Sequence, residues 1–208
     1  MKAKVTESYI QNLKQTLNPL GIEVAFSNDK NRWGQVQSKL TLTTYYKGIR
    51  FMLASFDAGD NNSNYAYSGL FIPVQIKKKD FFKMTKYYLL SHLFSFLTKT
   101  VKSSYDEINK SYLIYGKDSF FINKLLMNSE VRKFILLNSK YNYGLRPLKR
   151  KLFHEAGLKS RNDILYITTR THAWITDLNQ MVLLIDFGKT IIDHLIQKRS
   201  IRSPEFIN

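Results

Sequence analysis

The sequence predicts an α+β domain in which helices pack on one face of an antiparallel β-sheet. Residues Gly34–Tyr46 alternate between apolar and polar side chains, Lys47–Gly48 makes a turn, and Ile49–Phe56 returns as the hairpin partner. Amphipathic helical segments lie near both ends of the chain. Of the 208 residues, 44% are hydrophobic and 14% aromatic, which is enough to build one core. We therefore expect one domain over residues 1–199 and a flexible tail over 200–208.

Short apolar runs between turn residues predict the strands. A first short strand is expected at Ile22–Phe26. The main strands of the sheet are expected at Gly34–Tyr46, Ile49–Phe56, Gly69–Ile76, Tyr112–Tyr115 and Ile164–Thr169. Because Pro73 has no backbone N–H, its strand should lie at an edge or contain a bulge. The polar residues Asp57–Ser68 predict a long loop, which is either mobile or a binding loop.

Three segments predict helices from the spacing of their apolar side chains. Val5–Leu17 is amphipathic, with Thr6 as its N-cap. Phe81–Val101 is bounded by lysines, and its uncharged part is too short to span a bilayer. We interpret it as a buried helix, with an interfacial membrane helix as the alternative. Asp177 caps a final helix whose buried stripe ends at Ile196.

The central stretch Ser111–Leu137 predicts a strand, a turn at Gly116 and two helices. Asp118 or Ser119 is expected to cap the first helix, and Asn128 marks the start of the second. So many large apolar side chains must be buried against other layers, so this stretch is expected to be scaffold. Lys140–Arg161 is basic and contains Pro147, and it predicts loops.

The residue types exclude several kinds of chemistry. The chain has no cysteine, so it has neither a disulfide framework nor a thiolate nucleophile, and no apolar signal segment opens it. We expect a cytoplasmic protein, with peripheral attachment to an anionic membrane as the alternative. The four histidines lack metal-site spacing, and His194 is expected to be structural. Asp186–Phe187–Gly188 and Gly188–Lys189–Thr190 copy fragments of kinase and phosphate-loop motifs inside a helix, without the rest of either signature. We predict no cofactor, and we leave an enzyme only as a site assembled by folding.

Charge is the clearest functional signal, since 32 Lys and Arg stand against 16 Asp and Glu for a net charge of +16. Two segments, Lys77–Lys102 and Lys140–Arg161, each carry seven basic residues and one acidic residue. Contact with an anionic partner is predicted for Lys77, Lys78, Lys79, Lys83, Lys86, Arg146, Lys149, Arg150, Lys151, Tyr141 and Tyr143. Interleaved basic and aromatic side chains are typical of surfaces that bind phosphates and stack bases. A solvated basic face, or a lysine-rich coding bias, accounts for the same composition.

Three stretches resemble an uncharacterised bacterial domain family whose members often lie on the cytosolic side of paired transmembrane helices. The stretches are Ser68–Ile72, Tyr105–Leu137 and Ile164–Thr169, and the resemblance covers residues 65–197. It implies no activity and no site residues, because the shared features are packing patterns. The sequence therefore favours a non-enzymatic interaction module that binds a protein partner or an anionic membrane. The alternative is a nucleic-acid-binding protein without sequence specificity that uses residues 77–102 and 140–161.

Overall fold

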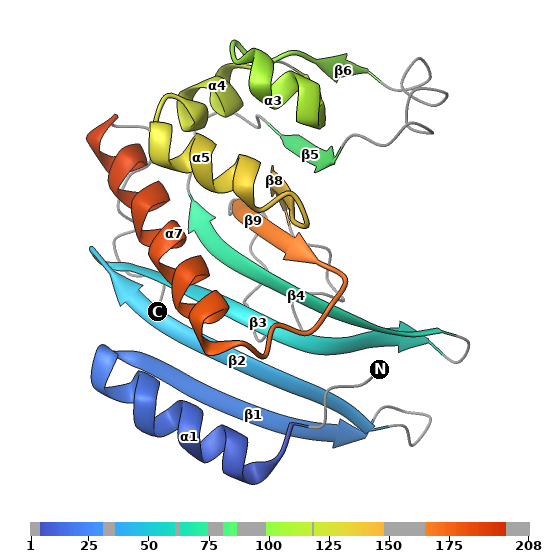
Figure 1. Ribbon diagram of the computed structural model, residues 1–208, viewed down its shortest axis with the longest axis vertical. Helices are drawn as coiled ribbons and strands as arrows, with labels where there is room; N and C mark the ends of the chain where they lie inside the picture. Colours follow the sequence, from blue (N-terminus) through green and yellow to red (C-terminus); the bar gives the residue numbers. More distant parts are fainter. Residues whose placement is uncertain are drawn as a thin grey trace.

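The computed structural model describes residues 5–30, 36–60, 63–74, 81–86, 99–117, 119–147 and 165–198, and it confirms the α+β class (Figure 1). Within these ranges one open antiparallel sheet has the strand order β1-β2-β3-β4-β9-β8-β5-β7-β6. Its strands are β1 (Ile22–Lys30), β2 (Val36–Tyr46), β3 (Ile49–Asp60), β4 (Ser63–Val74), β5 (Phe82–Lys86), β6 (Thr100–Val101), β7 (Tyr112–Gly116), β8 (Asn142–Arg146) and β9 (Leu165–Thr171). The helices are α1 (Glu7–Leu17), a 3-10 turn η1 (Asn18–Leu20), α3 (Asp106–Ser111), α4 (Phe120–Leu126), α5 (Ser129–Leu137) and α7 (Leu178–Gln197).

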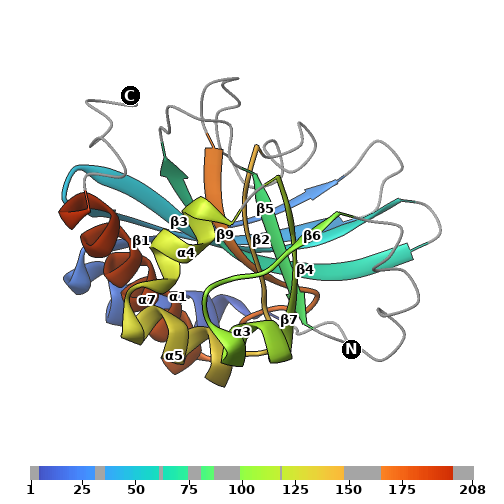
Figure 2. The same ribbon diagram turned by 90° about the horizontal axis from the view of Figure 1, so that it is seen from above.

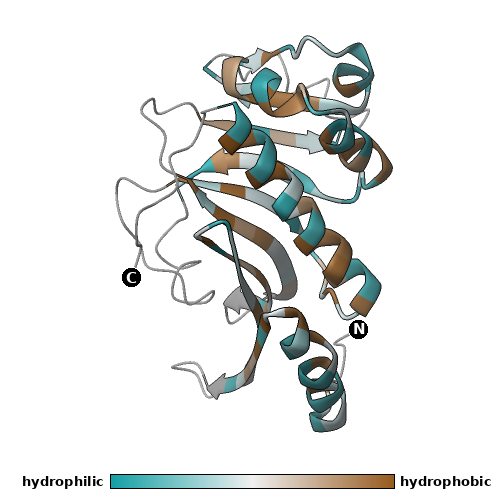
Figure 3. Ribbon diagram, turned by 90° about the vertical axis from the view of Figure 1, so that its left-hand side faces the viewer, coloured by the Kyte–Doolittle hydropathy of each residue, from teal (hydrophilic) through white to brown (hydrophobic). Residues whose placement is uncertain are grey.

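The helices lie on one face of the sheet, as Figure 2 shows from above. Helix α1 lies against β1, α7 lies against β3 and β4, and α5 packs on α7. The rings of Phe134 on α5 and Phe187 on α7 are stacked, with centroids 3.7 Å apart. Figure 3 shows apolar and polar residues alternating along α7. Its buried residues recur every three or four positions, so an apolar stripe faces the sheet.

Side-chain caps begin three of the helices. Thr6 accepts a hydrogen bond from the Tyr9 N–H, Asn128 accepts from two N–H groups of α5, and Asp177 accepts from the Gln180 N–H at 2.7 Å. These caps confirm the predicted helix starts, since each oxygen satisfies a donor that has no partner within its helix. Helix α4 differs, because Ser119 stands at its cap position without a capping bond and instead accepts from the Asn123 side chain. Asp118 lies outside the described residues.

The predicted loop Asp57–Ser68 is wrong over most of its length. Strand β3 continues to Asp60 and β4 starts at Ser63, so the two strands form a long hairpin around residues 61–62. Asp57 is paired within it, and its carboxylate accepts hydrogen bonds from the Ser38 N–H at 3.1 Å and the Trp174 Nε1–H at 3.0 Å. Hydrogen bonds between the two strands thus keep this polar segment in an extended conformation, although the strand propensity of its residues alone predicts a loop.

The predicted helix Phe81–Val101 is also wrong at both of its ends. Phe82–Lys86 forms β5 and Thr100–Val101 forms β6, while residues 87–98 lie outside the described part of the chain. Both strands pair with β7. In β5 Phe82 and Met84 are buried, whereas Lys83 between them is exposed. The loop predicted over Lys140–Arg161 is also wrong in part, because Asn142–Arg146 forms strand β8. Pairing with distant strands outweighs the local pattern in each case.

Pro73 lies in the sheet where its missing donor does little harm. The register of β4 with β3 runs from the Asp60–Ser63 pair to the Met52–Phe71 pair, whereas its register with β9 continues through Pro73 and Tyr166. Pro73 therefore lies beyond the β3 ladder, where β4 has edge character on that side. Strand β4 as a whole lies between β3 and β9, so the predicted edge strand is wrong, and Pro73 is accommodated only because the β3 ladder ends at Phe71.

Strand β8 approaches β5 closely at Gly144. A Cβ at this position would lie 2.9 Å from the Phe82 carbonyl oxygen, which belongs to the backbone. We expect Gly144→Ala to push the two strands apart and to lower the free energy of unfolding by about 1–3 kcal/mol. Urea denaturation followed by circular dichroism measures this loss. Asn142→Ala, on the same strand, is the control and should change stability much less; equal losses in the two variants would contradict the steric explanation.

Candidate functional site

The sheet face opposite the helices gathers basic side chains from separate parts of the sequence. Lys83 on β5 pairs with Gly144 on β8, which in turn pairs with Thr168 on β9. Paired residues point to the same face, and so do residues two positions apart along a strand. Arg146 and Arg170 are therefore on the same face as Lys83.

Arg50 joins this set from strand β3. It lies two residues from Met52, which pairs with Phe71 on β4, and Phe71 pairs with Thr168. Its charge also acts on the hydroxyl of Tyr166, the residue that pairs with Arg146. We call the set of Arg50, Lys83, Arg146 and Arg170 on this side of the sheet the cationic face; the residues between them, such as Phe71, Tyr166 and Thr168, are buried.

Few acidic groups balance these charges. Strands β4, β5, β7, β8 and β9 contain no Asp or Glu. By the same alternation the positions of Glu23 and Asp29 share the face, but they lie on the edge strand β1, four strands from β9, and the position of Asp60 shares it at the far end of β3. Lys83 and Arg50 are exposed, and Arg146 is half-buried. Exposed basic side chains on one face attract anions, and the strands that carry Lys83, Arg146 and Arg170 contribute no carboxylate.

Arg170 differs from the other three, because only 9% of it is exposed. Its Nη1 donates to the Tyr67 hydroxyl at 3.0 Å, and its guanidinium lies 6.0 Å from the centre of the same ring. Within the described part of the chain, the buried Nε–H has no hydrogen-bond acceptor. Burial lowers the pKa of Arg170, which the contact with Tyr67 partly offsets.

The structure brings together only some of the residues that the sequence predicted as contacts. Lys83 and Arg146, from the two separate basic segments, lie on neighbouring strands of the cationic face. Lys86 pairs with Tyr112, a residue of the helix-side core, and so belongs to the opposite face. The remaining predicted basic residues lie outside the described ranges; they are Lys77, Lys78, Lys79, Lys149, Arg150 and Lys151.

Tyr141 and Tyr143 are not surface contacts, which corrects the prediction. They are 1% and 4% exposed and lie in the core on the helix side. The Tyr141 hydroxyl accepts from Gln180 Nε2 at 2.5 Å, and the Tyr143 hydroxyl donates to the Asn138 carbonyl at 3.1 Å. Both polar tips are satisfied inside the protein, as buried tyrosines usually are. The alternation of Tyr143 and Leu145 with small or polar residues was the available sign of a half-buried strand.

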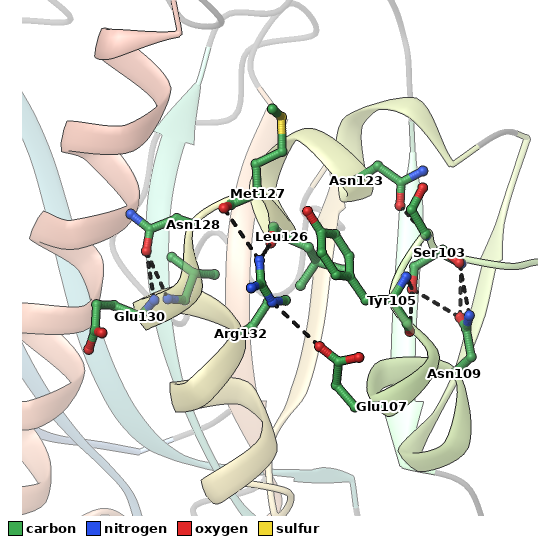
Figure 4. Close-up of polar contacts among 12 residues, drawn as sticks. Ser103, Tyr105, Glu107, Asn109, Asn123, Leu126, Met127, Asn128, Glu130 and Arg132 are labelled. Atoms are coloured by element: carbon green, nitrogen blue, oxygen red, sulfur yellow. Dashed lines mark hydrogen bonds and ion pairs between the residues drawn. The ribbon is translucent and has the colours of Figure 1, made fainter.

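A second polar cluster, shown in Figure 4, joins helices α3, α4 and α5. Arg132 Nη1 donates to the carbonyls of Leu126 and Met127 at the end of α4, at 2.5 and 3.3 Å. Its Nε lies 3.5 Å from Glu107 Oε1, and its guanidinium lies 4.3 Å from the centre of the Tyr105 ring. Because the Arg132 guanidinium is paired with groups of α3 and α4, we assign this residue a structural role.

His194 is structural, as the sequence indicated. It is 5% exposed, and its Nε2 lies 2.7 Å from the Lys124 carbonyl oxygen. The fragments that copy kinase and phosphate-loop motifs lie within α7, where Lys189 pairs with Asp186 at 2.9 Å. Gly188 faces the sheet, and a Cβ there would lie 3.0 Å from the Phe51 ring. This glycine therefore allows the helix to approach the sheet closely.

No family model, curated protein or solved structure matches the chain. The resemblance over residues 65–197 therefore remains a prediction. None of the described helices is both long enough and apolar enough to cross a bilayer.

The Arg132 contacts predict a structural role that lysine cannot replace. We expect Arg132→Lys to lower the free energy of unfolding by about 1–2 kcal/mol, because an ammonium loses the planar contact with Tyr105 and cannot reach the α4 carbonyls and Glu107 together. Chemical denaturation measures this. Lys133→Ala, an exposed neighbour on α5, is the control. A fully stable Arg132→Lys protein would show that the cluster contributes little.

Buried tyrosines predict a loss of stability at high pH. Burial raises the pKa of Tyr112, Tyr141 and Tyr166 to about 12. In the unfolded chain these groups ionise near pH 10, so the native state holds their protons longer. Their contribution to stability is complete below about pH 10 and is lost as the pH rises towards 12. Thermal unfolding across pH 8–12 tests this, together with tyrosinate absorbance. Normal ionisation of all tyrosines in the folded protein would contradict it.

Proposed function

We propose that the protein is a non-enzymatic interaction module that binds an anionic partner through its cationic face. The observation that carries this proposal is the register, which places Lys83, Arg146 and Arg170 on three adjacent strands that contain no acidic residue. These residues are far apart in the sequence. A general excess of Lys and Arg, spread evenly over the surface, would not by itself place these residues on one face of the sheet.

An anionic membrane surface or an acidic protein partner is the first candidate. Each Lys or Arg close to an anionic bilayer contributes about 1 kcal/mol of binding free energy, so a few side chains on one face support weak and reversible attachment. The resemblance to a family often carried next to membrane helices supports the same partner. Phe82–Lys86 is strand β5 and not part of the interfacial helix that the sequence offered as an alternative. We therefore base this candidate on the charges of the sheet face.

Nucleic acid is the second candidate, and one contact favours it. Lys83 Nζ lies 5.8 Å from the centre of the Tyr115 ring, and the two residues are paired across β5 and β7. Tyr115 is half-buried. A cation beside an aromatic ring on a sheet is suited to binding a phosphate and stacking a neighbouring base. The expected binding is independent of base sequence, because the described part of the chain places no base-reading helix beside the pair.

The two candidates are separated by measuring both kinds of binding with one set of variants. The wild type and the double variant Lys83→Glu/Arg146→Glu are compared in co-sedimentation with phosphatidylserine vesicles and in polarisation assays with labelled single-stranded DNA. We expect the reversal of two charges to weaken binding to the true partner by roughly tenfold or more. Lys133→Glu on the helix side is the matched control, because it also reverses an exposed charge.

The salt dependence gives a second readout for nucleic acid. If DNA is the partner, the slope of log affinity against log salt should fall by about 1 for each phosphate that the variant no longer neutralises. Binding to vesicles alone identifies the first candidate. A folded wild-type protein that binds neither vesicles nor DNA, and retains no acidic protein from pull-downs, refutes the proposed function.

A further inference from the structure

We infer that the guanidinium of Arg170 is the binding group for a single oxyanion, the phosphate or carboxylate group of an anionic partner. The inference rests on the proposed function for the identity of the partner, but the site itself is defined by contacts within β4 and β9. Arg170 is the only charged residue of β9, which is the fifth of the nine strands in the described sheet.

Arg170 is buried in a part of the sheet that offers no opposite charge. It lies next to Thr168 and Thr169, which are 0% and 1% exposed, and is itself only 9% exposed. A buried charge without an opposite charge is strongly unfavourable, and such groups are almost always paired. The described strands on either side of β9, which are β4 and β8, contain no acidic residue. Buried donors in native proteins are nearly always hydrogen-bonded, so the unpaired Nε–H of Arg170 calls for an explanation.

The Arg170 side chain is also held in a fixed orientation. A Cβ at Gly69 would lie 3.1 Å from Arg170 Cγ and 3.0 Å from the Phe71 ring. Glycine at this position therefore gives the Arg170 side chain room to lie across β4 towards Tyr67. The Tyr67 hydroxyl then receives one N–H of Nη1. This bond holds the guanidinium plane while Nε–H stays unbonded within the described part of the chain.

The donors of Arg170 and the charges around it define the class of ligand. A guanidinium presents parallel N–H groups whose spacing matches two oxygens of a phosphate or carboxylate. Lys83 and Arg146 lie on the same face, on strands β5 and β8. Their charges favour a dianion over a monoanion, so a phosphate monoester is expected to bind more tightly than a carboxylate.

The test follows the Arg170 Nε–Hε resonance in the full-length protein by NMR. Inorganic phosphate and acetate are titrated in separate arms at constant ionic strength, with chloride as the balancing anion. We expect a saturable shift of one Nε–Hε signal, larger with phosphate, and the signal is assigned by its loss in Arg170→Met. The thermal midpoint of the wild type should also rise with phosphate and level off, whereas that of Arg170→Met should not respond.

Two variants keep the test independent of folding. Arg170→Met removes an unpaired buried charge, so without added anion its midpoint should equal or exceed that of the wild type. Arg170→Lys keeps the charge but lacks the planar donor pair, and it should lose the saturable response. A larger acetate shift identifies a carboxylate as the ligand. The inference is overturned if the signal does not saturate with either anion, or if the phosphate response survives in both variants.

The outcome is separable from that of the proposed function. If phosphate binds saturably at Arg170 but the protein binds neither vesicles nor DNA, the oxyanion site is supported and the proposed polyanionic partner is refuted. The opposite result is partner binding that depends on Lys83 and Arg146 but not on Arg170, without saturable phosphate binding. That result refutes the oxyanion site and leaves the proposed function standing.

Discussion

The pairing of β9 between β4 and β8 holds the whole structure together. Strands β1 to β4 form a consecutive antiparallel meander, and β8, β5, β7 and β6 form the other part of the sheet. Strand β9 is hydrogen-bonded to both parts, with Ile72 on β4 paired to Ile167 and Leu145 on β8 paired to the same residue. Every residue from Leu165 to Arg170 is buried, as is typical of a strand covered on both faces. The core shared by α7 and α5 depends on this junction, because α7 packs on β3 and β4 while α5 packs on α7.

The junction also determines the chemistry of the sheet. Because β9 lies in the middle of the sheet, most of its polar residues are buried, and Arg170 is the charged residue among them. The neighbouring strands then set its surroundings: β4 supplies Gly69 and Tyr67, and β8 carries Arg146 on the same face. The basic residues of distant segments acquire a common orientation only through these registers. Net charge indicates an affinity for anions, whereas the register indicates where an anion can bind.

The elements that the sequence predicts correctly are those whose signal is local. Thr6, Asn128 and Asp177 cap their helices through bonds within three residues, and the hairpin at Lys47–Gly48 joins two adjacent strands. The errors have a different origin. Strands β5 and β8 are short and gain their stability from pairing with β7 and β9, which lie elsewhere in the sequence. The prediction for Tyr141 and Tyr143 was wrong for the same reason, because their burial depends on α7. Arg170 was missed because one arginine in the apolar run ILYITTRT gives no pattern, and its partners on β4 cannot be seen without the fold.

The position of β9 in the chain has a consequence for protein synthesis. The other described strands all emerge from the ribosome before it, including both of its neighbours. Until Leu165–Thr171 is available, β4 and β8 each present an unpaired edge, and an open apolar edge readily joins with other chains. The β4–β9 contacts also join residues that are distant in sequence, such as Ile72 and Ile167, which makes their formation slow. A chain that is truncated upstream of β9 therefore exposes both edges and is prone to aggregate.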